Sequence, residues 1–343
     1  MESKKRVALA LSSGGPRGFT YIGAIEVLRE RGYEISSVAG TSIGSLIGGI
    51  YAAGALDEFK EWLFTLDKWR VFSLMDLSLG GNHFVKGDRI IEAMREVVPS
   101  VNIEELSIPF RAIATDLYTG EEVVFDHGDL FAAIRASISI PSLFRPVPHG
   151  LSTLVDGFIV NCLPLSRTVR TDGDLLVAFD LNDINAEEIR SLLDRANKEQ
   201  AIKQMCEDAT LSEARELVEW SHSNRRQLGM LDRLKHIGSR ALTLFKDYVE
   251  VHNTPIEQVE EYDSYYSLID RAFSLMNHSQ TELSLQLYKP DIVVRMPFDA
   301  YGEIADYAKA QEIAEAGRTL MSEALDRYEA TLQPPHQSQL SHP

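Results

Sequence analysis

Two glycine-rich turns, each lying between a short apolar run and an apolar-periodic helix, constrain the fold of this chain most strongly. The first turn follows the apolar run 7–11 and reads Ser13-Gly14-Gly15-Pro16-Arg17-Gly18. The second follows Val38-Ala39 and reads Gly40-Thr41-Ser42-Ile43-Gly44. Short, continuous apolar runs are typical of buried parallel strands. The pattern therefore predicts two consecutive strand–turn–helix units at the start of an α/β sheet.

The second turn has the G-x-S-x-G pattern, in which the flanking glycines allow a turn tight enough to present the hydroxyl of Ser42. The first turn offers backbone N–H groups that can approach an anion closely. Turns from adjacent strands lie side by side, so the two together predict a nucleophile next to an oxyanion-binding loop. Each motif alone has another interpretation. The serine could simply cap a helix. The glycine loop is similar to a dinucleotide-binding fingerprint, but that fingerprint needs an acidic residue after the next strand, where this chain has Gly40-Thr41-Ser42.

The charge of the chain narrows the classes of partner. At 343 residues it can form one large domain or two smaller ones, and its net charge of −17 disfavours both nucleic acid and electrostatic adhesion to anionic lipid. Any membrane contact is therefore expected to be hydrophobic and local.

Cys162 and Cys206 are the two cysteines, which fits a reducing compartment. We interpret the N-terminal apolar run as a strand and not a signal peptide, and no apolar segment has the roughly 18 residues of a membrane span. We expect a cytoplasmic protein, with peripheral membrane contact.

Strand and helix patterns at both ends of the chain enclose a block with only helical periodicity. We predict a single domain over residues 6–328 with a helical insertion at about 186–285. The insertion has no Gly/Ser/Pro linkers around it, so its helices either pack on the sheet or border the substrate site. The polar and proline-containing tail, residues 331–343, is predicted to be disordered.

Asp156 is the favoured partner for Ser42. It follows Leu154-Val155 at the end of a predicted strand and precedes Gly157. An Asp-Gly pair alone is usually a turn, so the prediction rests on its combination with a strand-end serine. A Ser–Asp–His triad would need a histidine after Asp156. The four candidates all lie in the helical block, where a surface histidine is the commoner explanation: His222, His236, His252 and His278.

This combination of motifs resembles the patatin-like phospholipase family, in particular its bacterial members. The resemblance covers residues 6–182 closely and 290–325 loosely. It rests on five blocks in the family's order, which are residues 13–18, residues 40–44, Ala114-Thr115-Asp116-Leu117 with Thr119-Gly120-Glu121, Ala136-Ser137 with Ile140-Pro141 and Phe144-Arg145-Pro146-Val147, and Asp156-Gly157 with Asn161 and Pro164.

The resemblance implies a three-layer α/β/α sandwich with a mostly parallel central sheet, and a Ser42–Asp156 catalytic dyad that needs neither metal nor cofactor. Ser42 would attack an ester carbonyl and Asp156 would accept its proton. Pro16 has no N–H, so the implied oxyanion hole consists of the backbone N–H groups of Gly14, Gly15 and Arg17. The glycines that support the motif are Gly18, Gly40, Gly44 and Gly157.

The implied function is a serine lipid acyl hydrolase of the phospholipase A or lysophospholipase type. Its substrates would be phospholipids, lysophospholipids or other acyl esters, cleaved through an acyl-enzyme. Two alternatives stay open, a non-catalytic lipid-binding or regulatory module and an acyltransferase that uses the same dyad. The chain departs from the family at Ser13, where many members have glycine, and at Phe158, where they have glycine or alanine. The ring of Phe158 is the more serious change, since it could narrow the acyl site.

Overall fold

The computed structural model describes residues 5–74, 76, 83–185, 187, 189–190, 265–301 and 304–332. The strands of this part of the chain are β1 (Arg6–Leu11), β2 (Glu34–Thr41), β3 (His83–Val85), β4 (Phe110–Asp116), β5 (Glu122–Phe125), β6 (Ser142–Phe144), β7 (Val147–His149), β8 (Ser152–Asp156), β9 (Leu175–Asp183) and β10 (Ile292–Pro297). The α-helices are α1 (Thr20–Glu30), α2 (Ile43–Ala52), α3 (Leu56–Phe64), α4 (Lys68–Leu74), α5 (Asp88–Arg95), α6 (Leu130–Ser137), α9 (Tyr265–Tyr288) and α10 (Ala310–Leu332).

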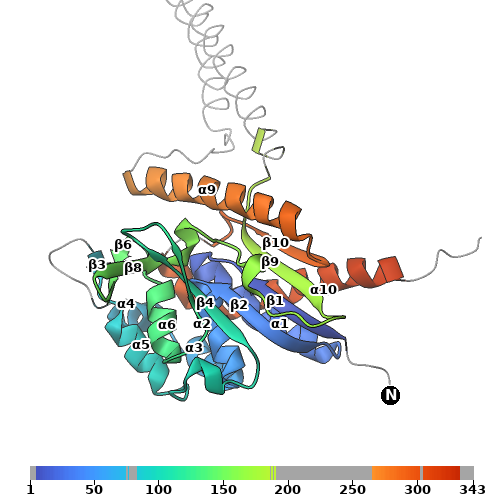
Figure 1. Cartoon of the computed structure of the whole chain (residues 1–343), viewed down its shortest axis with the longest axis horizontal. Coiled ribbons are helices and arrows are strands. Elements are labelled where there is room, and N and C mark those ends of the chain that lie inside the picture. The colour runs from blue at the N-terminus through green and yellow to red at the C-terminus, as the bar shows by residue number, and fades with distance from the viewer. Residues whose placement is uncertain are drawn as a thin grey trace, which may run out of the picture. The chain divides into compact units, whose positions relative to one another are not determined.

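The central sheet has eight strands, with the order β10-β9-β1-β2-β4-β8-β7 and with β5 on β4 (Figure 1). Five neighbouring strands, from β10 to β4, run parallel, whereas β5 and β8 are antiparallel to β4. The predicted strand–turn–helix units are confirmed as β1 to α1 and β2 to α2. The sheet is thus mixed, with a parallel centre that carries both turns at the carboxyl ends of adjacent strands.

Helices cover both faces of this sheet, which confirms the predicted sandwich (Figure 1). Successive side chains of a strand point to opposite faces. On β1, Val7, Leu9 and Leu11 belong to the main core, which also includes buried residues of α1, α2 and α10. Ala10 faces the other way, into a smaller cluster with Leu285 of α9. The parallel strands are therefore buried on both sides, as their continuous apolar sequences require.

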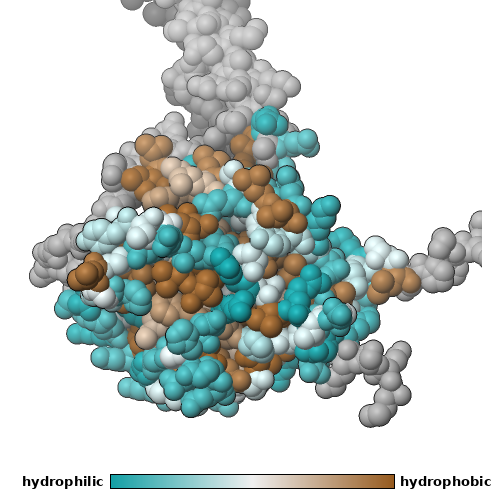
Figure 2. All heavy atoms as spheres, viewed as in Figure 1, coloured by the Kyte–Doolittle hydropathy of each residue, from teal (hydrophilic) through white to brown (hydrophobic). Residues whose placement is uncertain are grey.

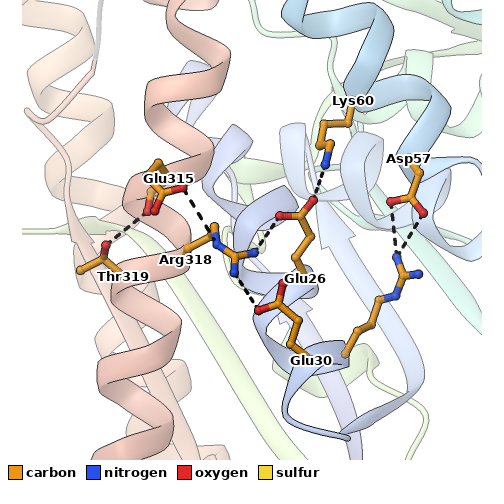
Figure 3. Close-up of polar contacts among 8 residues, drawn as sticks. Glu26, Glu30, Asp57, Lys60, Glu315, Arg318 and Thr319 are labelled. Carbon is orange, nitrogen blue, oxygen red and sulfur yellow. Dashed lines mark hydrogen bonds and ion pairs between the residues drawn. The ribbon is translucent and has the colours of Figure 1, made fainter.

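The C-terminal helix α10 packs directly on α1. A Cβ atom on Gly23 or on Gly317 would lie 2.0 Å from a backbone oxygen of the other helix, so the glycines allow this close approach. Ion pairs tie the rims of the contact (Figure 3). Arg318 pairs with Glu26 at 3.0 Å and with Glu30 at 2.7 Å, and Lys60 of α3 also pairs with Glu26. Helices from the two ends of the chain, α1 and α10, are thus packed together in one helical layer of the sandwich.

The chain separates into two compact units, residues 1–184 with 269–343 and residues 185–268. Most of α9 belongs to the first unit, whereas the predicted insertion extended to about residue 285. Most of that insertion lies outside the described residues, as does the predicted disordered tail apart from residues 331 and 332, which end α10. The division into one domain with an insertion therefore stays a prediction.

Candidate active site

Ser42 lies in a strained turn between β2 and α2. Its φ of 56° and ψ of −123° put a non-glycine residue in the positive-φ region. The turn is also tightly closed, because a Cβ on Gly40 would lie 2.3 Å from the backbone of Gly44. The backbone N–H of Ser42 donates to Ser137 Oγ at 2.9 Å, and the N–H of Ser45 donates to the Ser42 carbonyl. Neighbouring elements thus hold the serine in a conformation that it would not adopt alone.

Asp156 reaches Ser42 because two strands share one edge of β4. Along that edge β2 pairs with β4 as far as Thr41↔Ile113, and β8 continues the pairing from Asp156↔Ala114. On the other edge β5 pairs with these same residues of β4. The chain after Thr41 therefore turns away at the point where Asp156 arrives, and Ser42 Oγ donates to Asp156 Oδ2 at 2.5 Å.

The Asp156 carboxylate is buried and held from several sides. It is 0 % exposed, and the Phe158 N–H donates to its Oδ1 at 3.0 Å. Its own N–H donates to the Ser139 carbonyl, and Thr115 Oγ1 donates to its carbonyl at 3.0 Å. Burial raises the pKa of Asp156 to about 7, although the hydrogen bonds from Ser42 and the Phe158 N–H act in the opposite direction. The carboxyl can therefore accept a proton near neutral pH.

The glycine loop lies beside this pair. It continues β1 into a short 3-10 helix over Gly15–Phe19, and Gly15 has a φ of 56° and lines the same pocket as Ser42. Within the described residues, no acceptor takes the backbone N–H of Gly14 or Gly15. A Cβ on Gly18 would lie 2.2 Å from the side chain of Ile43, so this glycine lets the loop pack on the start of α2. Two N–H groups and a helix N-terminus thus meet next to Ser42.

Both side chains at which the sequence departs from the family pattern point away from the site. Ser13 donates its N–H to the Cys162 carbonyl at 3.1 Å, and its hydroxyl lies 3.2 Å from the Cys162 sulfur. The ring of Phe158 packs edge-on against Phe273 of α9, at 5.3 Å between centroids, and it is not among the residues that line the pocket. Neither change therefore narrows the space in front of Ser42.

The side chain of Arg17 ties the glycine loop to the rest of the sheet. It is 8 % exposed, its Nε donates to the Leu181 carbonyl at 3.0 Å, and Nη1 donates to the Phe298 carbonyl. The Leu181 carbonyl lies in the last part of β9, two residues before the strand ends, and Phe298 directly follows β10. The sequence implied a role for the backbone N–H alone, so this structural role of the guanidinium was missed.

We expect Arg17→Ala to lower stability as well as activity. The buried Leu181 carbonyl and the partly buried Phe298 carbonyl would lose a charged donor, which costs roughly 3 kcal/mol and corresponds to a Tm lower by about 6–12 °C. Differential scanning calorimetry measures this, with Arg111→Ala as the control, because Arg111 makes a single hydrogen bond to a carbonyl, that of Arg167, at a half-exposed position. Equal shifts for the two variants would contradict the structural role of Arg17.

An apolar pocket opens beside Ser42. Its walls come from α2, α3, α4, α5 and the segment 138–144, and Ser42 and Gly15 lie in its lining together with Tyr307. Burial raises the pKa of the Tyr307 phenol to about 12, so the hydroxyl stays protonated. Sequence reasoning identified none of these walls. The helical apolar pattern at residues 59–66 was the available signal, but it is equally typical of core packing.

His278 is the one candidate histidine that lies within the described residues. Among the described residues, no histidine hydrogen-bonds to Ser42 or Asp156, and His278 instead contacts the Asn182 carbonyl at 3.1 Å. The other three candidate histidines lie outside the described residues. His278 does approach two carboxylates, Asp183 and Glu282. Arg295 Nη1 already pairs with both carboxylates, at 2.8 and 2.5 Å, so the cluster is explained as an ion-pair network.

No helix in the described part of the chain has the length and hydrophobicity that crossing a membrane would require.

The chain is similar to several known proteins. The chain is 32% identical over 340 residues to an uncharacterized NTE family protein of Mycobacterium tuberculosis, covering 95% of this chain and 93% of the relative. It is 27% identical over 191 residues to Lysophospholipase NTE1 of Debaryomyces hansenii, covering 53% of this chain and 12% of that protein. The crystal structure of VipD from Legionella pneumophila aligns with a TM-score of 0.43 at 14% identity, covering 95% of this chain and 67% of VipD. A sequence model of the patatin-like phospholipase family matches residues 9–169, which contain both glycine turns, Ser42 and Asp156. The chain therefore belongs to the patatin-like phospholipase family, among its NTE family members.

Proposed function

We propose that this chain is a serine lipid acyl hydrolase in which Ser42 is the nucleophile and Asp156 the general base. The observation that carries the proposal is the 2.5 Å hydrogen bond between Ser42 Oγ and a fully buried Asp156, at the wall of an apolar pocket. A module that only bound lipid would have no need for a strained serine paired with a buried carboxylate. A relative named a lysophospholipase fits the same substrate class.

The first half of the reaction forms an acyl-enzyme. Ser42 Oγ attacks the ester carbonyl carbon while its proton passes to Asp156 Oδ2. The carbonyl oxygen becomes an oxyanion, which the N–H groups of Gly14, Gly15 and Arg17 would bind, and the N-terminus of α2 adds a favourable dipole. Asp156 then returns the proton to the departing alkoxide as the ester C–O bond breaks, leaving an acyl group on Ser42.

The second half releases the acid. A water molecule gives a proton to Asp156 and attacks the acyl carbonyl, and Ser42 leaves with that proton, so both residues return to their starting states. The acyl chain would occupy the pocket throughout, because its lining is dominated by apolar side chains such as Leu46, Leu63 and Ile90, which suit a hydrocarbon chain.

The test is an assay of the purified protein against phospholipids, lysophospholipids and soluble p-nitrophenyl acyl esters, with the released products identified by mass spectrometry. Free fatty acid is expected as the main product. Transfer of the acyl group to an added alcohol in place of water would instead assign an acyltransferase. Binding of lipid without turnover would favour the non-catalytic alternative.

Activity should rise with pH, because only the ionised Asp156 carboxylate can accept the proton. With a pKa of about 7 in the folded protein, kcat/KM should fall about tenfold per pH unit below 7 and level off above it. A soluble ester at pH 5–9 measures this profile, and circular dichroism checks the fold at each pH. A profile that stayed flat down to pH 5 would mean that Asp156 is not the titrating base.

A further inference from the structure

Helix α4 (Lys68–Leu74) forms part of the wall between the pocket and the outside of the protein. Its inner side chains, Val71 and Leu74, line the pocket together with Ser42. Figure 1 shows the helix beside α5, next to the short strands β3 and β6. One side of α4 is therefore committed to the space that the acyl chain would occupy.

The outer side of the same helix exposes two large aromatic side chains. Trp69 is 82 % exposed and Phe72 is 56 % exposed, although both types usually bury most of their surface. A tryptophan and a phenylalanine exposed next to each other on one turn are costly in water. They are typical of helices that rest in the boundary between lipid head groups and acyl chains.

The charged side chains of α4 itself are both positive. Lys68 and Arg70 are exposed and form no ion pair with the described residues, whereas the whole chain carries a net charge of −17. Asp67 directly precedes the helix, and its Oδ1 accepts the Arg70 N–H at 2.8 Å and so caps the first turn. Asp76, two residues past the helix, is paired with Lys86 at 3.9 Å and Arg89 at 3.8 Å. Cations between exposed aromatic rings match the phosphates of a lipid surface.

We propose that α4 docks the protein on a lipid surface, with Trp69 and Phe72 entering the interface and Lys68 and Arg70 contacting lipid phosphates. The proposal rests on the proposed function, since the partner is inferred from the pocket behind the helix. In this pose a lipid can pass from the membrane over Val71 and Leu74 toward Ser42 without its acyl chain crossing water. A protein partner fits less well, because seven residues offer far less than the roughly 800 Å² per side of a stable interface.

A second exposed apolar face competes for this role. Figure 2 shows hydrophobic residues gathered along α9, and the outer side of that helix exposes Leu283 by 65 % and Leu287 by 72 %. That face lacks the connection to the pocket that α4 has. It supplies a matched control, because the same number of exposed apolar side chains can be removed from each helix.

The experiment measures binding to vesicles of phosphatidylcholine with 30 mol% phosphatidylglycerol, in the Ser42→Ala background so that no lipid is consumed. The double variant Trp69→Ser/Phe72→Ser should bind at least about tenfold more weakly, since two large apolar side chains no longer leave water. Lys68→Gln/Arg70→Gln should lose about tenfold on these vesicles and much less on pure phosphatidylcholine. The control, Leu283→Ser/Leu287→Ser, should bind like the parent.

Tryptophan fluorescence gives an independent readout. Vesicles should shift the emission to the blue, and Trp69→Phe should remove most of that shift even though Trp62 and Trp220 remain. Unchanged binding of Trp69→Ser/Phe72→Ser, or an equal loss in the α9 control, would overturn the proposal. The proposal would also be overturned if Trp69→Ser/Phe72→Ser, made in protein that keeps Ser42, lost as much activity on a soluble ester as on vesicles. The aromatic side chains would then shape the pocket.

The two proposals fail in different ways. Hydrolysis of soluble esters without any vesicle binding would refute docking by α4 and leave the acyl hydrolase intact. Vesicle binding that depends on α4, without turnover of any ester, would refute the hydrolase and leave the docking surface.

Discussion

Replacing Ser42 by alanine is expected to lower kcat/KM for acyl esters by about 10⁴-fold or more. The change removes the attacking oxygen, so only pocket binding and the backbone N–H donors remain. The fold should tolerate it, because the backbone bonds of Ser42 to Ser137 and Ser45 do not involve its side chain. Loss of the hydroxyl donor would also raise the pKa of Asp156 further, so the buried carboxyl would stay neutral.

Covalent labelling isolates the nucleophile from other causes of lost activity. A fluorophosphonate probe should label the wild-type protein at Ser42 and leave Ser42→Ala unlabelled. Ser13→Ala is the matched control, since Ser13 is also a buried serine but its hydroxyl contacts Cys162. It should keep its labelling and activity within a few fold. If the Ser42→Ala variant were still labelled by the probe, or were still active, Ser42 would not be the nucleophile.

The local parts of this fold were predictable from the sequence, and the reason is physical. An apolar run of five or six residues, a glycine turn and a periodic helix each depend on neighbours in sequence. The elements β1 to α2 therefore lie where the pattern predicted them. The parallel pairing of β1 with β2 follows from that alternation, and it sets the glycine loop next to Ser42.

The meeting of Ser42 with Asp156 depends on pairing between distant strands. The two residues are 114 positions apart, and no local pattern shows that β8 continues the edge of β4 where β2 leaves it. The sequence also suggested an exposed serine hydroxyl, whereas Ser42 is 4 % exposed and faces the pocket. How far the Ser42 hydroxyl is exposed depends on the pocket around the turn, and the sequence of the turn alone does not determine it.

The pocket itself was not foreseen because its walls come from separate parts of the chain. The segment 139–147 reads as a proline-punctuated loop, yet it contains β6, which pairs with β3 about 60 residues earlier. Tyr307 enters the same lining from near the C-terminus. The direction of the Phe158 ring likewise depends on α9, whose Phe273 packs against it. Each of these features is decided by tertiary contacts.

Replacing Asp156 by asparagine is expected to lower kcat by about 10³-fold or more, because an amide cannot accept the Ser42 proton. The amide is nearly the same size, and its oxygen can still accept the Phe158 N–H, so the geometry should persist. His278→Ala is the control for a histidine base and should cost less than about tenfold, since His278 contacts Asn182 instead of the dyad. If His278→Ala lost as much activity as Asp156→Asn, a Ser–Asp–His triad would be the better assignment.

Stability separates a missing base from a damaged fold in the Asp156→Asn variant. The pKa of Asp156 is about 7 in the folded protein, and about 3.9 is usual for an unfolded chain. The protonated acid therefore stabilises the wild type fully below about pH 4, and this contribution is lost as the pH rises through 7. Asparagine stays neutral throughout, so the variant should gain Tm relative to the wild type between pH 5 and pH 8. An inactive protein that gained stability in this direction would have lost a buried base, whereas one destabilised at both pH values would have lost its fold.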